Sequence, residues 1–286
     1  MSSAPIKLKA TQPAGRVRWW STHVGLPTLG GLGITVLIAA AALFTPASPL
    51  ALGGADALLG HGRPAQAVAH YETVGAASPI LTLRKEAWRR AARVHELELD
   101  QPAEARRALG RLLELGVDAA EKGRIHEQLA ELHLAERDTS GAALQYRLAW
   151  DADPSDPVRL VRAAELRGSI AEFNRARALW TRLRKEAPPW APRANFGLGE
   201  LALAQGKPAQ AMRSFQLAAR TSDADLKSAA RLGLAVVYER LGELDGAMAE
   251  LDQVDLPRDL RDKRKTALRE RAAEMPSAER EKKTKK

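Results

Sequence analysis

The sequence contains no cysteine, and this absence removes several kinds of chemistry at once. A chain without thiols has no disulfide, no thiolate ligand for a metal, no cysteine nucleophile and no cysteine-linked lipid. Aromatic residues are also scarce, at 5% of a chain that is 45% hydrophobic. Because the apolar content is mostly Ala, Leu and Val, the composition favours closely packed helices over a sheet sandwich.

Motifs that carry catalysis are missing too. We find no glycine-rich phosphate loop, no serine-centred nucleophile elbow and no metal-ligand spacing. His126-Glu127 resembles the start of a zinc-protease helix, but the next histidine, His133, follows seven residues after the first instead of four. We therefore interpret both histidines as partly buried structural residues. We expect no enzyme, no cofactor, no metal and no small-molecule substrate.

The net charge of +9 is concentrated at the two ends of the chain. Residues 1–23 contain Lys7, Lys9, Arg16 and Arg18 with no acidic residue, and residues 258–286 contain twice as many basic as acidic side chains. The region between them is almost neutral. Because a nucleic-acid-binding domain carries its positive charge on the folded body, we expect no nucleic acid partner.

Residues 24–44 form an uncharged run of 21 residues. A helix of this length crosses the roughly 30 Å of hydrocarbon in a bilayer. Trp19 and Trp20 precede it, where aromatic rings prefer the headgroup level. The run predicts a transmembrane helix. A cleaved signal peptide and a buried core helix are the two alternatives, although the run is longer than a usual signal core and has no polar face for water.

The charge distribution also predicts the orientation of the span. Four cations precede it and few charged residues follow it, so the positive-inside rule places residues 1–23 in the cytoplasm. The rest would then be extracytoplasmic, which means the periplasm in a bacterium, on a single-pass protein of the inner or plasma membrane. Residues 45–55, with two prolines and two glycines, indicate a short tether.

A recurring pattern fills the remainder of the chain. A small residue is followed by a bulky residue four positions later and by an apolar residue three positions after that, and successive copies begin 34 to 38 residues apart. Such spacing places all three on one stripe of a helix that must pack against neighbours. The copies are Ala67, Tyr71, Val74; Ala105, Leu109, Leu112; Ala142, Tyr146, Ala149; Ala176, Trp180, Leu183; Ala211, Phe215, Ala218; and Ala247, Leu251, Val254.

With this period, and with Leu198-Gly199 and Leu234-Ala235 in the preceding helices, the sequence resembles the tetratricopeptide repeat family. The first two units lack the Leu-Gly pair. The resemblance implies an all-α fold: after the transmembrane helix, a right-handed solenoid of about six helical hairpins over residues 56–257. We expect a capping helix over 258–275 and a basic, disordered tail over 276–286. Bulky residues such as Trp180 and Phe215 should be buried between helices.

Three glutamates occupy the same place in successive first helices of the hairpins. Glu131, Glu165 and Glu200 lie 34 and 35 residues apart, on the face that the resemblance turns toward a concave groove. We predict an acidic ladder that binds a partner, unless these carboxylates only pair with neighbouring arginines. The other residues predicted for this partner-binding groove are Glu127, Arg193, Phe196, Leu232 and Glu239.

These features together predict a membrane-anchored scaffold or adaptor of the cell envelope that binds other proteins or peptide segments, including basic ones, through the groove. The alternative is a regulatory or assembly subunit of a membrane enzyme or secretion complex. A stand-alone enzyme is the least favoured interpretation.

The predicted topology is testable with reporter fusions. A reporter that is active only outside the cytoplasm, fused after Lys286, should be active, because the span carries the rest of the chain across the membrane. Activity of a cytoplasm-only reporter at the same site would contradict the orientation.

Overall fold

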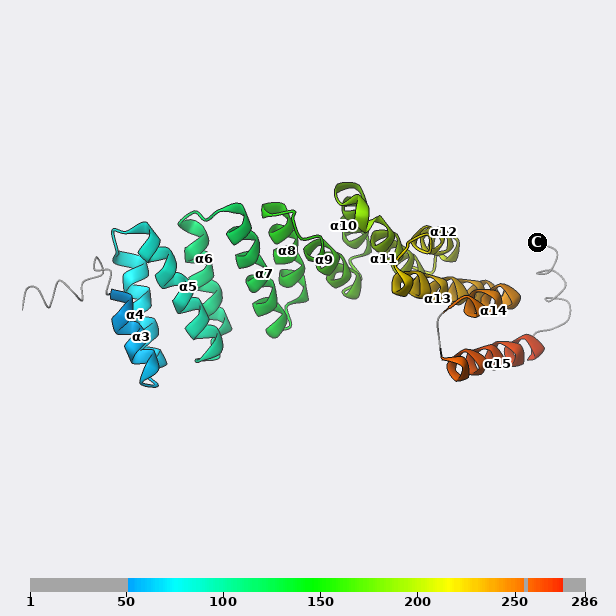
Figure 1. Ribbon diagram of the computed structural model, residues 1–286, viewed down its shortest axis with the longest axis horizontal. Coiled ribbons are helices and arrows are strands. Elements are labelled where there is room, and N and C mark those ends of the chain that lie inside the picture. The colour runs from blue at the N-terminus through cyan, green and yellow to red at the C-terminus, as the bar shows by residue number, and fades with distance from the viewer. Residues whose placement is uncertain (1–50, 255–256, 275–286) are drawn as a thin grey trace, which may run out of the picture. The chain divides into compact units, whose positions relative to one another are not determined.

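The computed structural model describes residues 51–254 and 257–274, and in these ranges the chain forms helices and no strand (Figure 1). The α-helices are α3 (Ala51–Gly60), α4 (Pro64–Ala77), α5 (Leu81–Leu97), α6 (Pro102–Glu114), α7 (Ala119–Ala135), α8 (Thr139–Ala152), α9 (Val158–Ser169), α10 (Phe173–Glu186), α11 (Ala191–Ala204), α12 (Pro208–Ala218), α13 (Ala224–Leu241), α14 (Leu244–Asp252) and α15 (Arg258–Glu274). A short 3-10 helix, η1 (Pro188–Trp190), precedes α11.

The helices pair in chain order into six hairpins, from α3–α4 to α13–α14, as the repeat pattern predicts. The chain divides into two compact units at Leu115–Gly116. Helices α3 to α6 belong to the first unit and α7 to α15 belong to the second. The expected all-α, tetratricopeptide-like helical architecture is therefore confirmed.

The membrane-related predictions fall largely outside the described residues. The predicted span, 24–44, and the predicted tail, 276–286, are not among them. Within the ranges that are described, no helix combines the length and apolar character needed to cross a membrane. Of the tether predicted for 45–55, only residues 51–55 are described, and these are helical, as part of α3.

Each hairpin turns through a residue in the left-handed backbone region. Between α11 and α12, Gly206 has φ 68°, its N–H donates to the carbonyl of Leu203, and the N–H of Lys207 donates to the carbonyl of Ala202. This is the Schellman arrangement, which satisfies the last carbonyls of a helix and reverses the chain sharply. The residues with positive φ at the six turns are Gly62, Asp100, Arg137, Ala171, Gly206 and Gly242.

The residues of the repeated sequence pattern form much of the hydrophobic core. All six leading alanines are at most 1% exposed, which lets the partner helices approach closely. The bulky residues lie between helices as predicted: Trp180 is 3% and Phe215 is 1% exposed. The Phe215 ring packs against two glycines, because a Cβ on either Gly199 of α11 or Gly233 of α13 would approach it to 2.7 Å.

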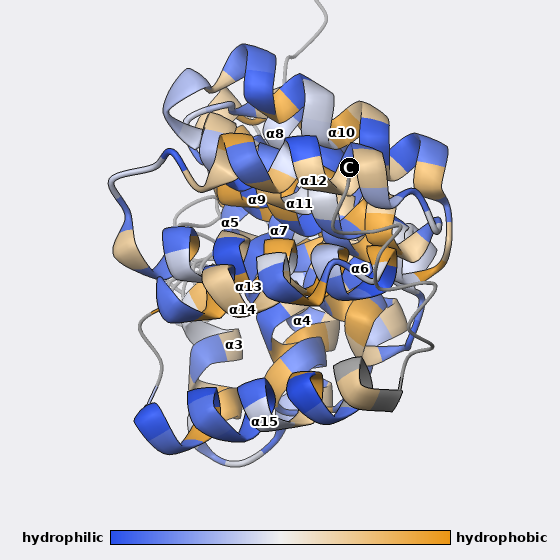
Figure 2. Ribbon diagram, turned by 90° about the vertical axis from the view of Figure 1, so that its right-hand side faces the viewer, coloured by the Kyte–Doolittle hydropathy of each residue, from blue (hydrophilic) through white to orange (hydrophobic). Residues whose placement is uncertain are grey.

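The last helix packs against the final hairpin through few apolar side chains. Leu268 of α15 is buried in a cluster with Leu244 and Leu251 of α14, and Lys265 forms an ion pair with Asp252. The remaining surface of α15 is predominantly hydrophilic (Figure 2). Helix α15 thus covers the apolar end of the stack and presents a charged surface outward.

The contact between Phe215 and Gly199 predicts that the effect of Gly199→Ala on stability depends on whether the Phe215 ring is present. We expect Phe215→Ala to lower the free energy of unfolding by about 3 to 5 kcal/mol, because it leaves a cavity in the core. Gly199→Ala should destabilise the wild type by about 1 to 3 kcal/mol through overpacking. In the Phe215→Ala background the same change should be neutral or stabilising, since the ring is gone and Ala is the better helix former.

Urea unfolding of the four proteins in this cycle measures the coupling. Gly110→Ala is the matched control, because a Cβ at Gly110 in helix α6 meets no atom within 4 Å. It should raise stability by about 0.5 to 1 kcal/mol. Equal costs of Gly199→Ala with and without the Phe215 ring would contradict the packing.

Candidate functional site

The eight predicted groove residues all lie on first helices of hairpins in the second unit. We call this set the first-helix face. It comprises Glu127 and Glu131 on α7, Glu165 on α9, Arg193, Phe196 and Glu200 on α11, and Leu232 and Glu239 on α13.

Three of these residues, Glu165 on α9 and Arg193 and Phe196 on α11, form one connected group. Arg193 Nη2 donates to Glu165 Oε1 at 2.5 Å, and the guanidinium carbon of Arg193 lies 5.4 Å from the centre of the Phe196 ring. The Phe196 ring meets the buried Phe215 ring edge to face, with their centres 5.6 Å apart. Ion pair, cation–π contact and aromatic contact therefore connect the surface to the core, and they hold Arg193 and Phe196 in place.

Glu200 interacts electrostatically with Arg193 and Glu165 of this group, and its carboxylate is available. Its side chain reaches solvent, and no hydrogen bond or ion pair to it is present among the described residues. Its pKa is raised, chiefly because surrounding protein atoms displace water, and the Glu165 carboxylate adds to this rise while Arg193 opposes it. A cationic group that replaced the missing water would stabilise the ionised form.

The other two glutamates of the predicted ladder, and the neighbouring groove residue Glu127, have partners within the protein. Glu131 accepts a hydrogen bond from the hydroxyl of Tyr146 on α8, and the pKa of Tyr146 is raised by burial and by this carboxylate. Glu165 pairs with Arg193, and Glu127 accepts from the buried Arg159 at 3.3 Å. The expected uniform acidic strip is therefore divided into satisfied carboxylates and the available Glu200.

The two residues on α13 have different surroundings. Leu232 packs against the cluster that includes Leu251 of α14 and Leu268 of α15, so it contributes to the last hairpin's core. Glu239 is half-buried further along α13. Leu232 thus belongs to a different cluster from Phe196.

A further carboxylate belongs to the same series and was not predicted. In the first unit, the hydroxyl of Tyr71 donates to Asp56 Oδ1 at 2.5 Å, and Arg90 also donates to that carboxylate. Burial, followed by the bond to Asp56, raises the pKa of Tyr71 to about 12. The pairs Tyr71–Asp56 and Tyr146–Glu131 are both separated by 15 residues. A carboxylate 15 residues before the bulky residue of a repeat was therefore the sequence signal that could have identified Asp56.

The histidines noted in the sequence have structural partners. His126 is 8% exposed, and its Nδ1 lies 2.8 Å from Gln145 Oε1; burial lowers the pKa of its imidazole. His133 Nδ1 lies 2.9 Å from Asp138 Oδ2 at the start of α8. Among residues 51–254 and 257–274, no group of three His, Asp or Glu side chains is arranged to hold a metal ion.

The comparison with known protein families agrees with this array of helical hairpins. Two family models, both described as tetratricopeptide repeat, match residues 94–157 and 161–226 in one case and 202–265 in the other. Together these ranges cover more than half of the 286 residues. The chain belongs to the tetratricopeptide repeat family.

Several solved structures resemble this tetratricopeptide repeat protein at low sequence identity. YrrB, a TPR protein with an unusual peptide-binding site, is 15% identical over 65% of this chain and 89% of its own, with a TM-score of 0.41. PilW, a type IV pilus biogenesis factor, is 18% identical over 71% and 90%, with a TM-score of 0.41. PilF of Pseudomonas aeruginosa is 20% identical over 60% and 75%, with a TM-score of 0.43. A search of curated protein sequences gives no match.

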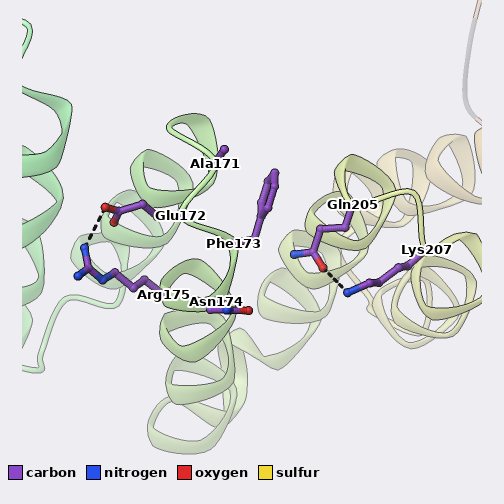
Figure 3. A pocket seen from close by; sticks show the side chains of 7 residues that line it. All are labelled: Ala171, Glu172, Phe173, Asn174, Arg175, Gln205 and Lys207. Carbon is purple, nitrogen blue, oxygen red and sulfur yellow. Dashed lines mark hydrogen bonds and ion pairs between the residues drawn. The ribbon is translucent and has the colours of Figure 1, made fainter.

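Two pockets of the repeat array were not predicted. One, of about 540 Å³, lies between η1 and the start of α13 and has Trp190, Arg193 and Asp225 in its lining. The other, of about 640 Å³, is formed by the turns α9–α10 and α11–α12 (Figure 3). Pockets of this kind depend on how two distant turns approach each other, so the sequence contains no local signal for them.

The raised pKa of Glu200 predicts how stability depends on pH. A carboxyl group whose pKa is higher in the folded state favours folding while it is protonated, and this contribution is lost as pH rises through the folded-state pKa. Glu200→Gln should therefore have a higher melting temperature than wild type at pH 7. The difference should shrink at about pH 4, near the usual glutamate pKa of about 4.3, where Glu200 becomes neutral.

The measurement is the thermal unfolding of both proteins across this pH range. Asp262→Asn, which neutralises an exposed carboxylate on α15, is the control and should show no such trend. A Glu200→Gln variant that is less stable than wild type at pH 7 would contradict the desolvation of this carboxylate.

Proposed function

We propose that this tetratricopeptide repeat protein is a membrane-anchored scaffold of the cell envelope that binds partner polypeptides on the first-helix face. The observation that carries the proposal is the group formed by Arg193, Phe196 and Glu200. It combines a half-buried aromatic ring with an exposed carboxylate that has a raised pKa and no hydrogen bond or ion pair among the described residues. The corresponding carboxylates of the two preceding repeats, Glu131 and Glu165, are paired within the protein, so Glu200 is the one of the three that is open to a ligand.

The group favours a particular chemistry in the partner. A lysine or arginine side chain would pair with Glu200, and an apolar neighbour in the same segment would cover Phe196. An exposed ion pair contributes only about 0 to 1 kcal/mol, so the carboxylate selects the partner and the buried apolar contact provides most of the affinity. The proposed ligand is thus a basic segment that also contains an apolar residue.

The membrane anchor in this proposal rests on the sequence. The uncharged run 24–44, the preceding tryptophans and the four cations of residues 1–23 support a single span with a cytoplasmic N-terminus. The repeats would then lie outside the cytoplasm, in the periplasm of a bacterium. A scaffold held at the membrane would concentrate its partners there, which is the physical advantage of tethering a binding domain.

The binding face is tested by comparing what co-purifies with variants of the full-length chain in mild detergent. Glu200→Lys and Phe196→Ala should each lose partners that the wild type retains. The loss from Glu200→Lys should be larger at low salt than at 1 M salt, where the screening length falls to about 3 Å. The loss from Phe196→Ala should persist at both, because the apolar contact is not screened.

Asp262→Lys is the charge-matched control, because it makes the same change at an exposed carboxylate on α15. It should retain the wild-type partners. If Glu200→Lys and Phe196→Ala both retain every partner at low salt, the first-helix face is not the binding surface.

A further inference from the structure

The chain beyond α15 contains a dense run of positive charge. Residues 275–286 include Arg280 and four lysines against two glutamates. The lysines are confined to residues 282–286, Lys-Lys-Thr-Lys-Lys, which we call the lysine run. This segment has the charge that Glu200 favours, but it contains no apolar residue that would cover Phe196.

The first-helix face is acidic, and its open carboxylate is Glu200. The eight residues of this face include five glutamates and one arginine. Three of these glutamates accept hydrogen bonds from other side chains, whereas no hydrogen bond or ion pair to Glu200 is present among the described residues. The neighbouring Glu165 carboxylate also repels the charge of Glu200. A cation placed here would therefore pair with one carboxylate and reduce its repulsion with another.

Two apolar clusters connect α15 to α11 within the second unit. Leu268 of α15 shares a cluster with Leu251 of α14 and Ala235 of α13. Helix α13 also provides Leu234 to the cluster that includes Phe196 of α11. The path from α15 through α14 and α13 to α11 thus crosses three helix–helix spacings of 8–10 Å, or about 30 Å at most.

The chain that follows α15 is long enough to cover this distance. Helix α15 ends at Glu274, and the lysine run begins eight residues later and ends twelve residues later. An extended chain spans about 3.3 Å per residue, so these lysines can lie about 26 to 40 Å from the end of the helix. That range includes the spacing between α15 and α11.

Attachment to the same chain compensates for a weak contact. A short flexible linker holds a segment at an effective concentration of about 1 mM, so a segment whose separate Kd is also about 1 mM would occupy the face half of the time. Charge without apolar cover is the composition of such a weak ligand. A partner segment that also covers Phe196 would displace it.

We propose that the lysine run binds within the same molecule to the first-helix face at Glu200 and competes there with partner polypeptides. The inference rests on the proposed function, because it names a regulator of the same face. The lysine run would exclude ligands that offer positive charge alone and admit those that add an apolar contact. The face would thereby gain selectivity without any further residue in the repeats.

The contact is tested by carbodiimide crosslinking of the full-length chain in mild detergent, which joins a lysine amine to a carboxylate that it touches. We expect an amide between Glu200 and the lysine run in the monomer, identified by peptide mass spectrometry, with a yield that does not depend on protein concentration. The yield should fall at 1 M salt, where the screening length is about 3 Å. Absence of this crosslink, or its presence only in dimers, would overturn the proposal.

The competition is measured by fluorescence anisotropy with a fluorescein-labelled Leu-Ala-Lys-Ala-Lys-Leu amide. The tail variant changes all four lysines of the run to glutamine: Lys282→Gln, Lys283→Gln, Lys285→Gln and Lys286→Gln. At low salt it should bind this probe at least about twofold more tightly than wild type, because half-occupation of a site doubles the apparent Kd. At 1 M salt, where charges are screened beyond about 3 Å, the two proteins should bind equally.

A charge-matched control separates occupation of the face from general repulsion of a cationic probe. It removes four exposed cations on α13 and α15 through Lys227→Gln, Arg258→Gln, Lys263→Gln and Arg264→Gln. This control should bind the probe as wild type does. An equal gain in affinity from the control and the tail variant would overturn the proposal.

Glu200→Lys distinguishes failure of this inference from failure of the proposed function. It should abolish probe binding with either the wild-type or the glutamine-substituted run, and its melting temperature will show that the fold is retained. Equal probe affinity of wild type and the tail variant, with loss in Glu200→Lys, would overturn the role of the lysine run and leave the binding face intact. Probe binding that Glu200→Lys does not affect would contradict the binding face itself.

Discussion

The packing of Phe215 between two glycines is the contact on which the arrangement of α11, α12 and α13 depends. The ring fills the space between α11, α12 and α13 because Gly199 and Gly233 have no side chains to fill it. Three helices approach closely around one buried aromatic group as a result. The same ring contacts Phe196 edge to face, and the Phe196 ring in turn contacts the guanidinium group of Arg193. The positions of Arg193 and Phe196 at the surface thus depend on the packing of Phe215 in the core.

The residue type at the bulky position of the repeat also influences the surface carboxylate 15 residues earlier. Where that residue is Tyr146, its hydroxyl reaches Glu131 and satisfies it. Where it is Phe215, no hydroxyl is present, and Glu200 is left without a partner among the described residues. In these two repeats the core tyrosine accompanies a paired carboxylate and the core phenylalanine accompanies an unpaired one. Repeats with the same backbone can differ in binding for this reason.

The sequence by itself determined the helical class, the number of hairpins and the register of the core, because these depend on periodic apolar residues and on turn chemistry near each position. The leading alanines and residues such as Trp180 and Phe215 are buried where the period places them. The first unit's carboxylate, Asp56, was recoverable from the 15-residue offset, although the weak repeat signature around it hid the pattern.

Only the tertiary structure decided which carboxylates have partners and where pockets form. Glu131, Glu165 and Glu200 are equivalent in sequence, yet their surroundings differ because Tyr146 and Arg193 approach from neighbouring helices. The pocket formed by the α9–α10 and α11–α12 turns likewise depends on two segments that meet across more than 30 residues of chain. Side-chain partners of this kind are chosen by three-dimensional proximity, which a local period does not specify.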